Sequence, residues 1–298
     1  KEQARSRTDC SAHCIRETNF VMPELPEVET VRAGLEKHVV GKKIISVKQL
    51  HPRALRAESL NKLTIFKGAK IKAVKRRGKF MWLTLNRPYV LTAHLGMSGQ
   101  FLIHQKDRPQ AKHPRARFLL KKSLRAQELI FNDQRTFGWL SIEETADNIP
   151  TSAQHIAPDP FDPLFDKSAT IQKYRKRSIP IKNALLNQEI MSGVGNIYAD
   201  ETLWRAKIHP LTPTSRLTEK ELATIITKAT QVMRSAIEKG GTSFDDLYIN
   251  VNGESGYFER SLAVYGREGE PCRRCGGEIS RIAFANRSSR FCPACQTR

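Results

Sequence analysis

The stretch NIPTSAQHIAPDPFDP, residues 148–163, separates two parts of the chain that have different character. It contains four prolines and shows little hydrophobic periodicity. Proline lacks an amide hydrogen and interrupts both helices and strand ladders. We therefore predict a linker at residues 148–165, between one domain at residues 23–147 and another at residues 166–262.

The part before the linker is predicted to be mostly β, after one opening helix. Apolar residues recur at three- and four-residue steps from Leu25 to Val39, which predicts a helix that begins near Glu24 and ends at Gly41. Between about Lys42 and Leu140 the sequence changes to short β-rich runs, among them KIISVKQL, FMWLTL, YVLTAHL and ELIFND.

The part after the linker shows helical periods instead. Thr218 and Glu221 fit a capping box, in which each side chain binds a backbone amide of the other residue. Apolar residues then line one face from Leu222 to Ile237, and Gly240 ends the pattern. We expect a helical second domain, followed by a small metal-binding tail at residues 263–298.

The composition indicates a folded protein that binds a polyanion. The chain has 298 residues, of which 39% are hydrophobic, and its 50 Lys and Arg against 30 Asp and Glu leave a net charge of +20. Nucleic acid is the first partner that such a surplus suggests. A membrane is not expected, because the sequence has no apolar run of about 18 residues and no basic amphipathic helix with an apolar face.

Three separate segments carry much of this positive charge. Residues 70–80 and residues 167–182 each contain six basic residues and no acidic one. Five arginines lie around the C-terminal cysteines, namely Arg273, Arg274, Arg281, Arg287 and Arg290. A basic run alone is typical of a solvated face, but three of them together favour a groove that holds a DNA backbone.

Four cysteines near the C-terminus form two C-x-x-C pairs, Cys272 with Cys275 and Cys292 with Cys295. This spacing suits a β-hairpin that brings four thiolates to one tetrahedral Zn²⁺. The alternatives are two disulfides or cysteines that never meet. With four protein ligands the zinc would be structural, because no position is left for water or substrate.

Several motifs, taken together, resemble the formamidopyrimidine-DNA glycosylase family, the bacterial enzymes that excise oxidised purines. The first is Met-Pro-Glu-Leu-Pro-Glu-Val-Glu-Thr at residues 22–30, and the likeness continues to residue 298. The others are Lys75-Arg-Arg-Gly-Lys79-Phe, His94-Leu-Gly-Met97, Asn132-Asp-Gln-Arg135-Thr-Phe137, Gly193-Val-Gly-Asn196, Gly256-Tyr-Phe and the segment from Val264 to the zinc hairpin.

The resemblance implies an α+β fold of two domains. The N-terminal domain would be a β-sandwich with flanking helices. The C-terminal domain would contain a helix-two-turn-helix element and a zinc-binding β-hairpin. Damaged duplex DNA would lie in the cleft between the domains.

The resemblance also implies catalytic roles for four residues. Pro23 would attack the sugar as an N-terminal secondary amine, which a proline inside the chain cannot do because its nitrogen is a planar amide. Glu24 would act as the acid, with Glu27 in support. Lys79 would serve β-elimination, and Arg287 would serve δ-elimination and phosphate binding.

A second group of residues would bind the DNA. A buried base must leave the duplex to be reached, and the resemblance implies that Met97, Arg135 and Phe137 fill the space it leaves. It also implies phosphate contacts near the lesion from His113, Arg177, Lys182 and Asn196.

Some features depart from the family pattern. Gln134 and Thr136 flank Arg135 where proline and a second cation are usual, and Arg290 takes a place that is often aromatic. The larger departure is the leader at residues 1–22, which is polar and lacks the apolar stretch of a secretory signal. We expect it to be absent from the mature enzyme, since its retention would convert Pro23 into an amide.

Two alternative functions remain open from the sequence. One is an endonuclease VIII-type glycosylase, which prefers oxidised pyrimidines. The other is a zinc-stabilised DNA-binding protein without catalysis, if the leader is retained. For a glycosylase of this family we expect one structural Zn²⁺, a soluble monomer and a cytoplasmic location in association with the bacterial nucleoid.

Overall fold

The computed structural model describes residues 22–56, 65–103, 111–122, 125–242, 258–284 and 286–298. The leader up to residue 21 and residues 256–257 of the Gly-Tyr-Phe motif lie outside the described residues. None of the helices in the described ranges combines the length and apolar character needed to cross a lipid bilayer.

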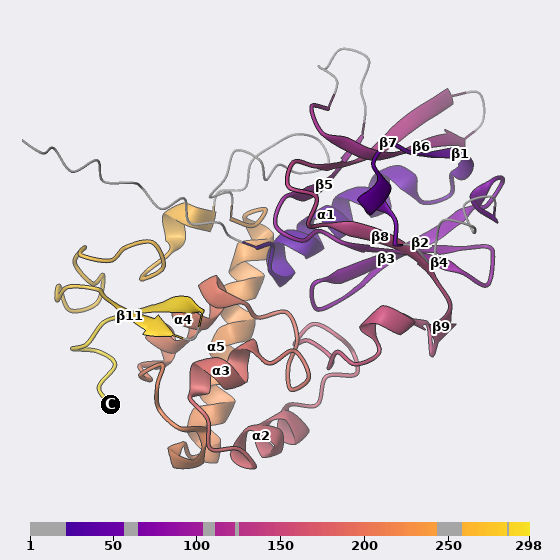
Figure 1. The fold of residues 1–298 in the computed structure, drawn as a ribbon. Helices are drawn as coiled ribbons and strands as arrows, with labels where there is room; N and C mark the ends of the chain where they lie inside the picture. The colour runs from indigo at the N-terminus through magenta and orange to yellow at the C-terminus, as the bar shows by residue number, and fades with distance from the viewer. Residues whose placement is uncertain (1–21, 57–64, 104–110, 123–124, 243–257, 285) are drawn as a thin grey trace, which may run out of the picture.

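Two antiparallel sheets form the N-terminal half (Figure 1). One has the order β1-β6-β7-β5 and the other has the order β2-β3-β4-β8. Their strands are β1 (Lys43–Gln49), β2 (Ile71–Arg77), β3 (Phe80–Leu85), β4 (Val90–His94), β5 (Gly99–Ile103), β6 (Pro114–Lys122), β7 (Arg125–Asp133) and β8 (Trp139–Glu143). Buried residues of both sheets, such as Phe118 and Met81, belong to one apolar core, so the sheets pack as the predicted sandwich.

The opening helix α1 (Leu25–Val39) links the sandwich to the helical half. Val28, Val31, Leu35 and Val39 pack in the sandwich core, whereas Leu25 packs in the core of the helical half. The helix has the predicted periodicity, and its first turn is thus buried by both parts of the protein. This position matters because the candidate acid Glu24 precedes that turn.

Helices build the C-terminal half, as predicted. They are α2 (Lys167–Arg175), α3 (Ile181–Leu186), α4 (Asn196–Ala206) and α5 (Glu219–Glu238). Thr218 and Glu221 form the predicted capping box at the start of α5. Short elements lie between the main helices and strands of both halves. They are η1 (Pro52–Ala54), β9 (Thr145–Ala146), β10 (Ile149–Pro150), η3 (Thr151–Ala153), η4 (Thr214–Arg216) and η5 (Phe258–Ser261).

A two-stranded hairpin of β11 (Ser280–Phe284) and β12 (Arg287–Phe291) follows the helices. Figure 1 shows it beside α4. The hairpin therefore lies against the same helix whose first turn faces the start of α1.

Candidate active site

The Glu24 carboxylate is held by the first turn of α4. Its Oε2 accepts a hydrogen bond from the Gly195 amide at 2.7 Å, and its Oε1 accepts one from the Ile197 amide at 2.9 Å. The amides at a helix start have no partner within the helix, and the helix dipole favours a negative group there. A Cβ at Gly195 would lie 2.3 Å from Glu24 Cδ, so only glycine leaves room for the carboxylate.

Burial makes Glu24 a weaker acid than an ordinary glutamate. Only 2% of the residue is exposed, and loss of solvation raises the pKa of its carboxyl from 4.5 to about 7. The charge of Lys79 opposes this rise and that of Glu27 adds to it. A pKa near neutrality allows the group to give and take a proton at physiological pH.

Glu27 anchors the start of α1 to the helical half. Its Oε1 accepts hydrogen bonds from the Tyr198 hydroxyl at 2.7 Å and from the Thr242 amide at 2.9 Å. Its Oε2 accepts from the Glu24 amide at 3.0 Å. Glu27 is therefore placed to orient Glu24 rather than to face a substrate.

Lys79 lies in the two-residue turn between β2 and β3. It lines the same cavity as Glu24. Burial lowers the pKa of its ammonium group, the Glu24 carboxylate opposes this, and the nearby Arg287 lowers it further. A lowered pKa gives Lys79 more of the neutral amine that can remove a proton.

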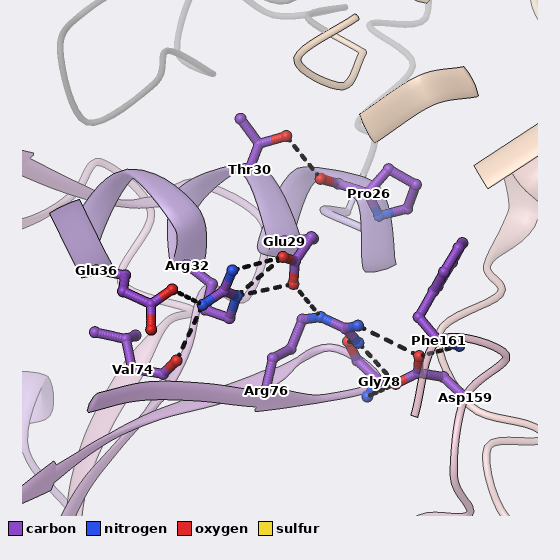
Figure 2. Close-up of polar contacts among 10 residues, drawn as sticks. All are labelled: Pro26, Glu29, Thr30, Arg32, Glu36, Val74, Arg76, Gly78, Asp159 and Phe161. Carbon is purple, nitrogen blue, oxygen red and sulfur yellow. Dashed lines mark hydrogen bonds and ion pairs between the residues drawn. The ribbon is translucent and has the colours of Figure 1, made fainter. Parts of the chain in front are cut away.

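An ion-pair network fixes the turn that carries Lys79 (Figure 2). Asp159 of the predicted linker accepts a hydrogen bond from the Gly78 amide at 3.0 Å and pairs with Arg76 at 2.7 Å. Arg76 in turn pairs with Glu29 of α1 at 2.9 Å. The side chains of Arg76 and Asp159 are only 7% and 1% exposed, so the pair binds α1, β2 and the linker together.

Glu24 and Lys79 line a single cavity of about 290 Å³. Pro23 is buried directly before Glu24 and is joined in this chain to Met22, a cavity residue. The lining residues are Met22, Glu24, Lys79, Met97, Gly195, Asn196, Ile197, Tyr265, Arg287, Ser288 and Arg290. One acid, one amine and two guanidinium groups thus line the same space.

The predicted filling residues lie on two adjoining loops of the sandwich. Met97 lies between β4 and β5 and reaches the cavity, while Arg135 and Phe137 lie between β7 and β8. Phe137 is 59% exposed. The buried Asp133 binds the Gly138 amide at 2.7 Å and the Ser98 hydroxyl, which ties the two loops together.

The four C-terminal cysteines form one cluster, and none is in a disulfide. Their sulfur atoms all lie within 4.8 Å of one another. Tetrahedral Zn–S bonds of about 2.3 Å would place the sulfurs about 3.8 Å apart, so the four thiols fit Zn²⁺. The Trp204 indole donates to Cys272 Sγ at 3.3 Å, an outer contact that orients this ligand.

Three family models match the chain in succession. The formamidopyrimidine-DNA glycosylase N-terminal domain matches residues 22–140, its H2TH domain matches residues 156–246, and a zinc finger found in FPG and IleRS matches residues 269–298. The formamidopyrimidine-DNA glycosylase of Nocardioides sp. is 51% identical over 278 residues, which are 92% of this chain and 94% of that protein. The chain belongs to the formamidopyrimidine-DNA glycosylase family.

Other members of the family extend the comparison. The formamidopyrimidine-DNA glycosylase of Rhodococcus jostii is 51% identical over 92% of this chain and 96% of its own. The Lactococcus lactis Fpg in complex with DNA containing an abasic site has a TM-score of 0.81 and 35% identity, covering 93% of this chain and all of the other. MutM in complex with DNA containing carbocyclic 8-oxo-G has a TM-score of 0.80 and 36% identity.

Membership of the glycosylase family confirms the main predictions about fold and function class. The protein is a DNA-repair glycosylase with an N-terminal β-sandwich, a helix-two-turn-helix domain and a zinc-finger hairpin. The four-cysteine cluster is consistent with one structural Zn²⁺. Relatives have been crystallised with damaged DNA.

The residues predicted to contact phosphates have different surroundings in this glycosylase. Asn196 begins α4 and lines the cavity. His113 precedes β6 and is half-buried, and Arg177 follows α2 and donates to the Lys173 carbonyl at 2.9 Å. Lys182 differs from them, because it is 0% exposed and pairs with Asp200 at 2.7 Å.

The burial of Lys182 shows that the cations of the basic segments do not all line the predicted groove. Arg76 and Arg77 also pair within the protein, with Asp159 and with Asp162. Arg290 is 1% exposed, pairs with Glu268 at 2.8 Å and stacks over the ring of Tyr265. Several of these cations therefore hold parts of the protein together instead of facing outward.

The sequence did not single out the acidic partners of these cations. Asp159 lies in a proline-rich segment that looked like a simple connection, and Asp200 lies in the middle of a helix. A weak signal existed, since a carboxylate inside an otherwise apolar helical stretch is rarely buried without a partner.

Proposed function

We propose that this glycosylase removes oxidised purines from duplex DNA and then cleaves the abasic strand through a covalent adduct on Pro23. The cavity that Glu24, Lys79 and Arg287 line next to Pro23 is the observation that carries the proposal. The substrate class is supported by relatives crystallised with DNA containing 8-oxo-G, Fapy-dG or an abasic site.

Base release begins with the Pro23 nitrogen. Its lone pair bonds to C1′ of the extruded nucleotide, and the base departs with the electrons of the glycosidic bond. The nitrogen loses its proton, which neutralises the departing base, and forms an iminium as the C1′–O4′ bond breaks. Glu24 gives O4′ its proton, which suits a carboxyl whose pKa burial raises to about 7.

Strand cleavage follows from the iminium. Removal of a proton from C2′ expels the 3′ phosphate, and removal of a further proton from C4′ expels the 5′ phosphate. Lys79 serves the first elimination, because burial lowers the pKa of its amine. Arg287 serves the second elimination and binds a departing phosphate, which its planar guanidinium matches well.

The exposed loops fill the space that the extruded nucleotide leaves. Met97 and Phe137 act as apolar wedges, and Arg135 pairs with the orphaned base, usually cytosine. His113, Arg177 and Asn196 contact phosphates around the lesion. Lys182 supports this region from within, since its ammonium group is wholly buried.

The active form begins at Pro23 in this proposal. A bonded Met22 leaves the proline nitrogen as an amide without a reactive lone pair. The match to the family's N-terminal domain begins at residue 22, so residues 1–21 lie outside the matched domain.

Borohydride trapping tests the proposal. A preparation that begins at Pro23 is expected to become covalently joined to abasic-site DNA in borohydride, because the reagent reduces the iminium. The 298-residue chain is the matched control and is expected to give no adduct. Failure of the Pro23 preparation to form an adduct would leave a DNA-binding protein without this chemistry.

Lesion preference is tested separately. Duplexes carrying 8-oxoguanine opposite cytosine or thymine glycol should be compared in single-turnover reactions. We expect faster release of 8-oxoguanine. A Lactococcus lactis relative was crystallised with DNA containing an oxidised pyrimidine, so the ratio of rates decides the preference. Faster release of thymine glycol would favour the endonuclease VIII-type alternative.

We also propose that the enzyme acts as a monomer in the cytoplasm, associated with the nucleoid through DNA. Glu24, Lys79 and Arg287 of one chain meet at the cavity, so the proposed chemistry requires no residue from a second copy. Light scattering of the DNA complex tests this, and a mass of two chains per duplex would contradict it.

A further inference from the structure

Lys182 and Asp200 form an ion pair with no exposed side-chain surface. Lys182 Nζ lies 2.7 Å from Asp200 Oδ1, and both side chains are 0% exposed. Lys182 comes from α3 and Asp200 from α4. A buried pair loses its hydration and is favourable only where further hydrogen bonds satisfy both groups. The chemical steps proposed above use neither residue.

The other hydrogen bonds of this pair reach β12. Asp200 accepts from the Ser289 hydroxyl at 2.8 Å and from the Arg290 amide at 3.0 Å. Lys182 donates to the Ser288 carbonyl at 3.0 Å. The pair therefore forms hydrogen bonds with three consecutive residues of β12.

These contacts to the helices stabilise β12, whose own sheet has only two described strands. It pairs only with β11 among the described strands, and an isolated two-stranded hairpin is marginally stable. The cysteine cluster and Trp204 hold the hairpin at one end. The Lys182–Asp200 pair holds the strand nearer to its start, which is Arg287.

Helix α4 connects the Lys182–Asp200 pair to Glu24. Asp200 lies four residues after Asn196, the first residue of α4, which corresponds to about 6 Å along the helix. The amides at that end of α4 hold the Glu24 carboxylate. Glu24 and Arg287 both line the cavity, so α4 sets the spacing between them.

We propose that Asp200, together with Lys182, is a positioning residue that holds β12 so that Arg287 faces the cavity opposite Glu24. This inference rests on the proposed function. A displacement of about 1 Å in such a group can slow its step by about a hundredfold, so the Lys182–Asp200 pair matters for the elimination that Arg287 serves. Steps that depend on Pro23 and Glu24 are expected to change much less.

The substitution Asp200→Asn tests this proposal in the form that begins at Pro23. On abasic-site DNA we expect the ratio of doubly cleaved to singly cleaved product to fall about tenfold. The rate of borohydride trapping should change less than about threefold. Glu219→Gln is the matched control, because it removes a carboxylate from an exposed ion pair with Arg175 in the same helical half.

Ser289→Ala is the milder variant if Asp200→Asn does not fold. It removes one hydrogen bond to Asp200 and leaves the ion pair intact, and we expect a smaller shift of the product ratio in the same direction. In an Arg287→Ala background neither variant should alter the ratio further, which separates positioning from a general loss of stability.

Hydrogen exchange of the 298-residue chain provides a readout without catalysis. Asp200→Asn should speed exchange of the Arg290 amide, while zinc content stays at one ion per chain. If the wild-type Pro23 form cleaves no DNA, the proposed function fails and exchange alone decides this inference. An unchanged product ratio in folded variants, or unchanged exchange at Arg290, would overturn it.

Discussion

The cavity around Glu24 and the two sandwich loops that carry Met97, Arg135 and Phe137, here called the filling loops, differ in burial and in the parts of the chain that form them. Glu24 reaches across 171 residues of sequence to the Gly195 amide, and its surroundings are buried where the two halves of the protein meet. Met97, Arg135 and Phe137 lie on loops of the sandwich alone, and Phe137 is largely exposed. Under the proposed function, the chemistry thus depends on docking of the two halves, whereas insertion into DNA depends on the sandwich alone.

The largest effect is expected at the buried carboxyl. Glu24→Gln keeps the shape of the side chain but cannot donate a carboxyl proton, so excision of 8-oxoguanine by the Pro23 form should fall about a thousandfold. Single-turnover kinetics would measure this. Glu36→Gln, which changes a partly exposed residue of the same helix, is the control. A loss of less than about tenfold for Glu24→Gln would contradict the assigned role.

The ion-pair network at the domain junction should be sensitive to loss of one partner. Asp159→Asn leaves the buried Arg76 with less compensation, and we expect unfolding free energy to fall by about 3 kcal/mol. Denaturant titration would measure this. Glu128→Gln breaks a partly exposed pair with Arg117 and should change stability by less than about 1 kcal/mol. Equal effects of the two substitutions would remove the distinction between docked and surface regions.

The pH dependence of stability should carry the signature of Glu24. Its folded pKa of about 7 lies above the ordinary 4.5, so the folded chain holds the proton more tightly than the unfolded chain. The resulting stabilisation is complete below pH 4.5 and is lost as pH rises through 7, by up to about 3 kcal/mol.

Comparison with Glu24→Gln isolates this contribution in the 298-residue chain. Relative to wild type, the variant should gain up to about 3 kcal/mol between pH 4.5 and pH 8, because its amide does not titrate. Denaturation at each pH would measure the difference. A constant difference across this range would show that burial does not raise the pKa of Glu24.

The filling loops should show a smaller effect, confined to duplex substrates. Phe137→Ala removes an exposed wedge, so excision of 8-oxoguanine from duplex DNA should slow by about tenfold to a hundredfold. Thermal stability should hardly change, because the side chain is 59% exposed. Cleavage of single-stranded abasic DNA serves as the control and should keep its rate. A matching loss on single strands would show that Phe137 acts in the cavity.

Local patterns predicted much of this fold. The apolar periods of α1 and α5, the β-rich runs and the cysteine spacing depend on residues close in sequence, and the structure agrees with each of them. The motif around Met22 predicted the family. These signals require no knowledge of how the two halves meet.

The sequence could not predict which cations are buried. Lys182 and Arg177 belong to the same basic run, yet Lys182 lies inside the protein and Arg177 is only partly buried. The difference arises from Asp200, which reaches Lys182 only when α3, α4 and β12 pack together. Asp159 likewise gains its role when the linker folds back onto the Gly78 turn.

The contact between Trp204 and Cys272 gives the zinc finger an optical reporter. The indole lies against a metal-ligand sulfur and under the Arg274 guanidinium, whereas the chain's other two tryptophans, Trp82 and Trp139, belong to strands of the sandwich. Fluorescence emission from Trp204 should therefore change when a chelator withdraws the ion, and the signal would follow release of the hairpin in real time.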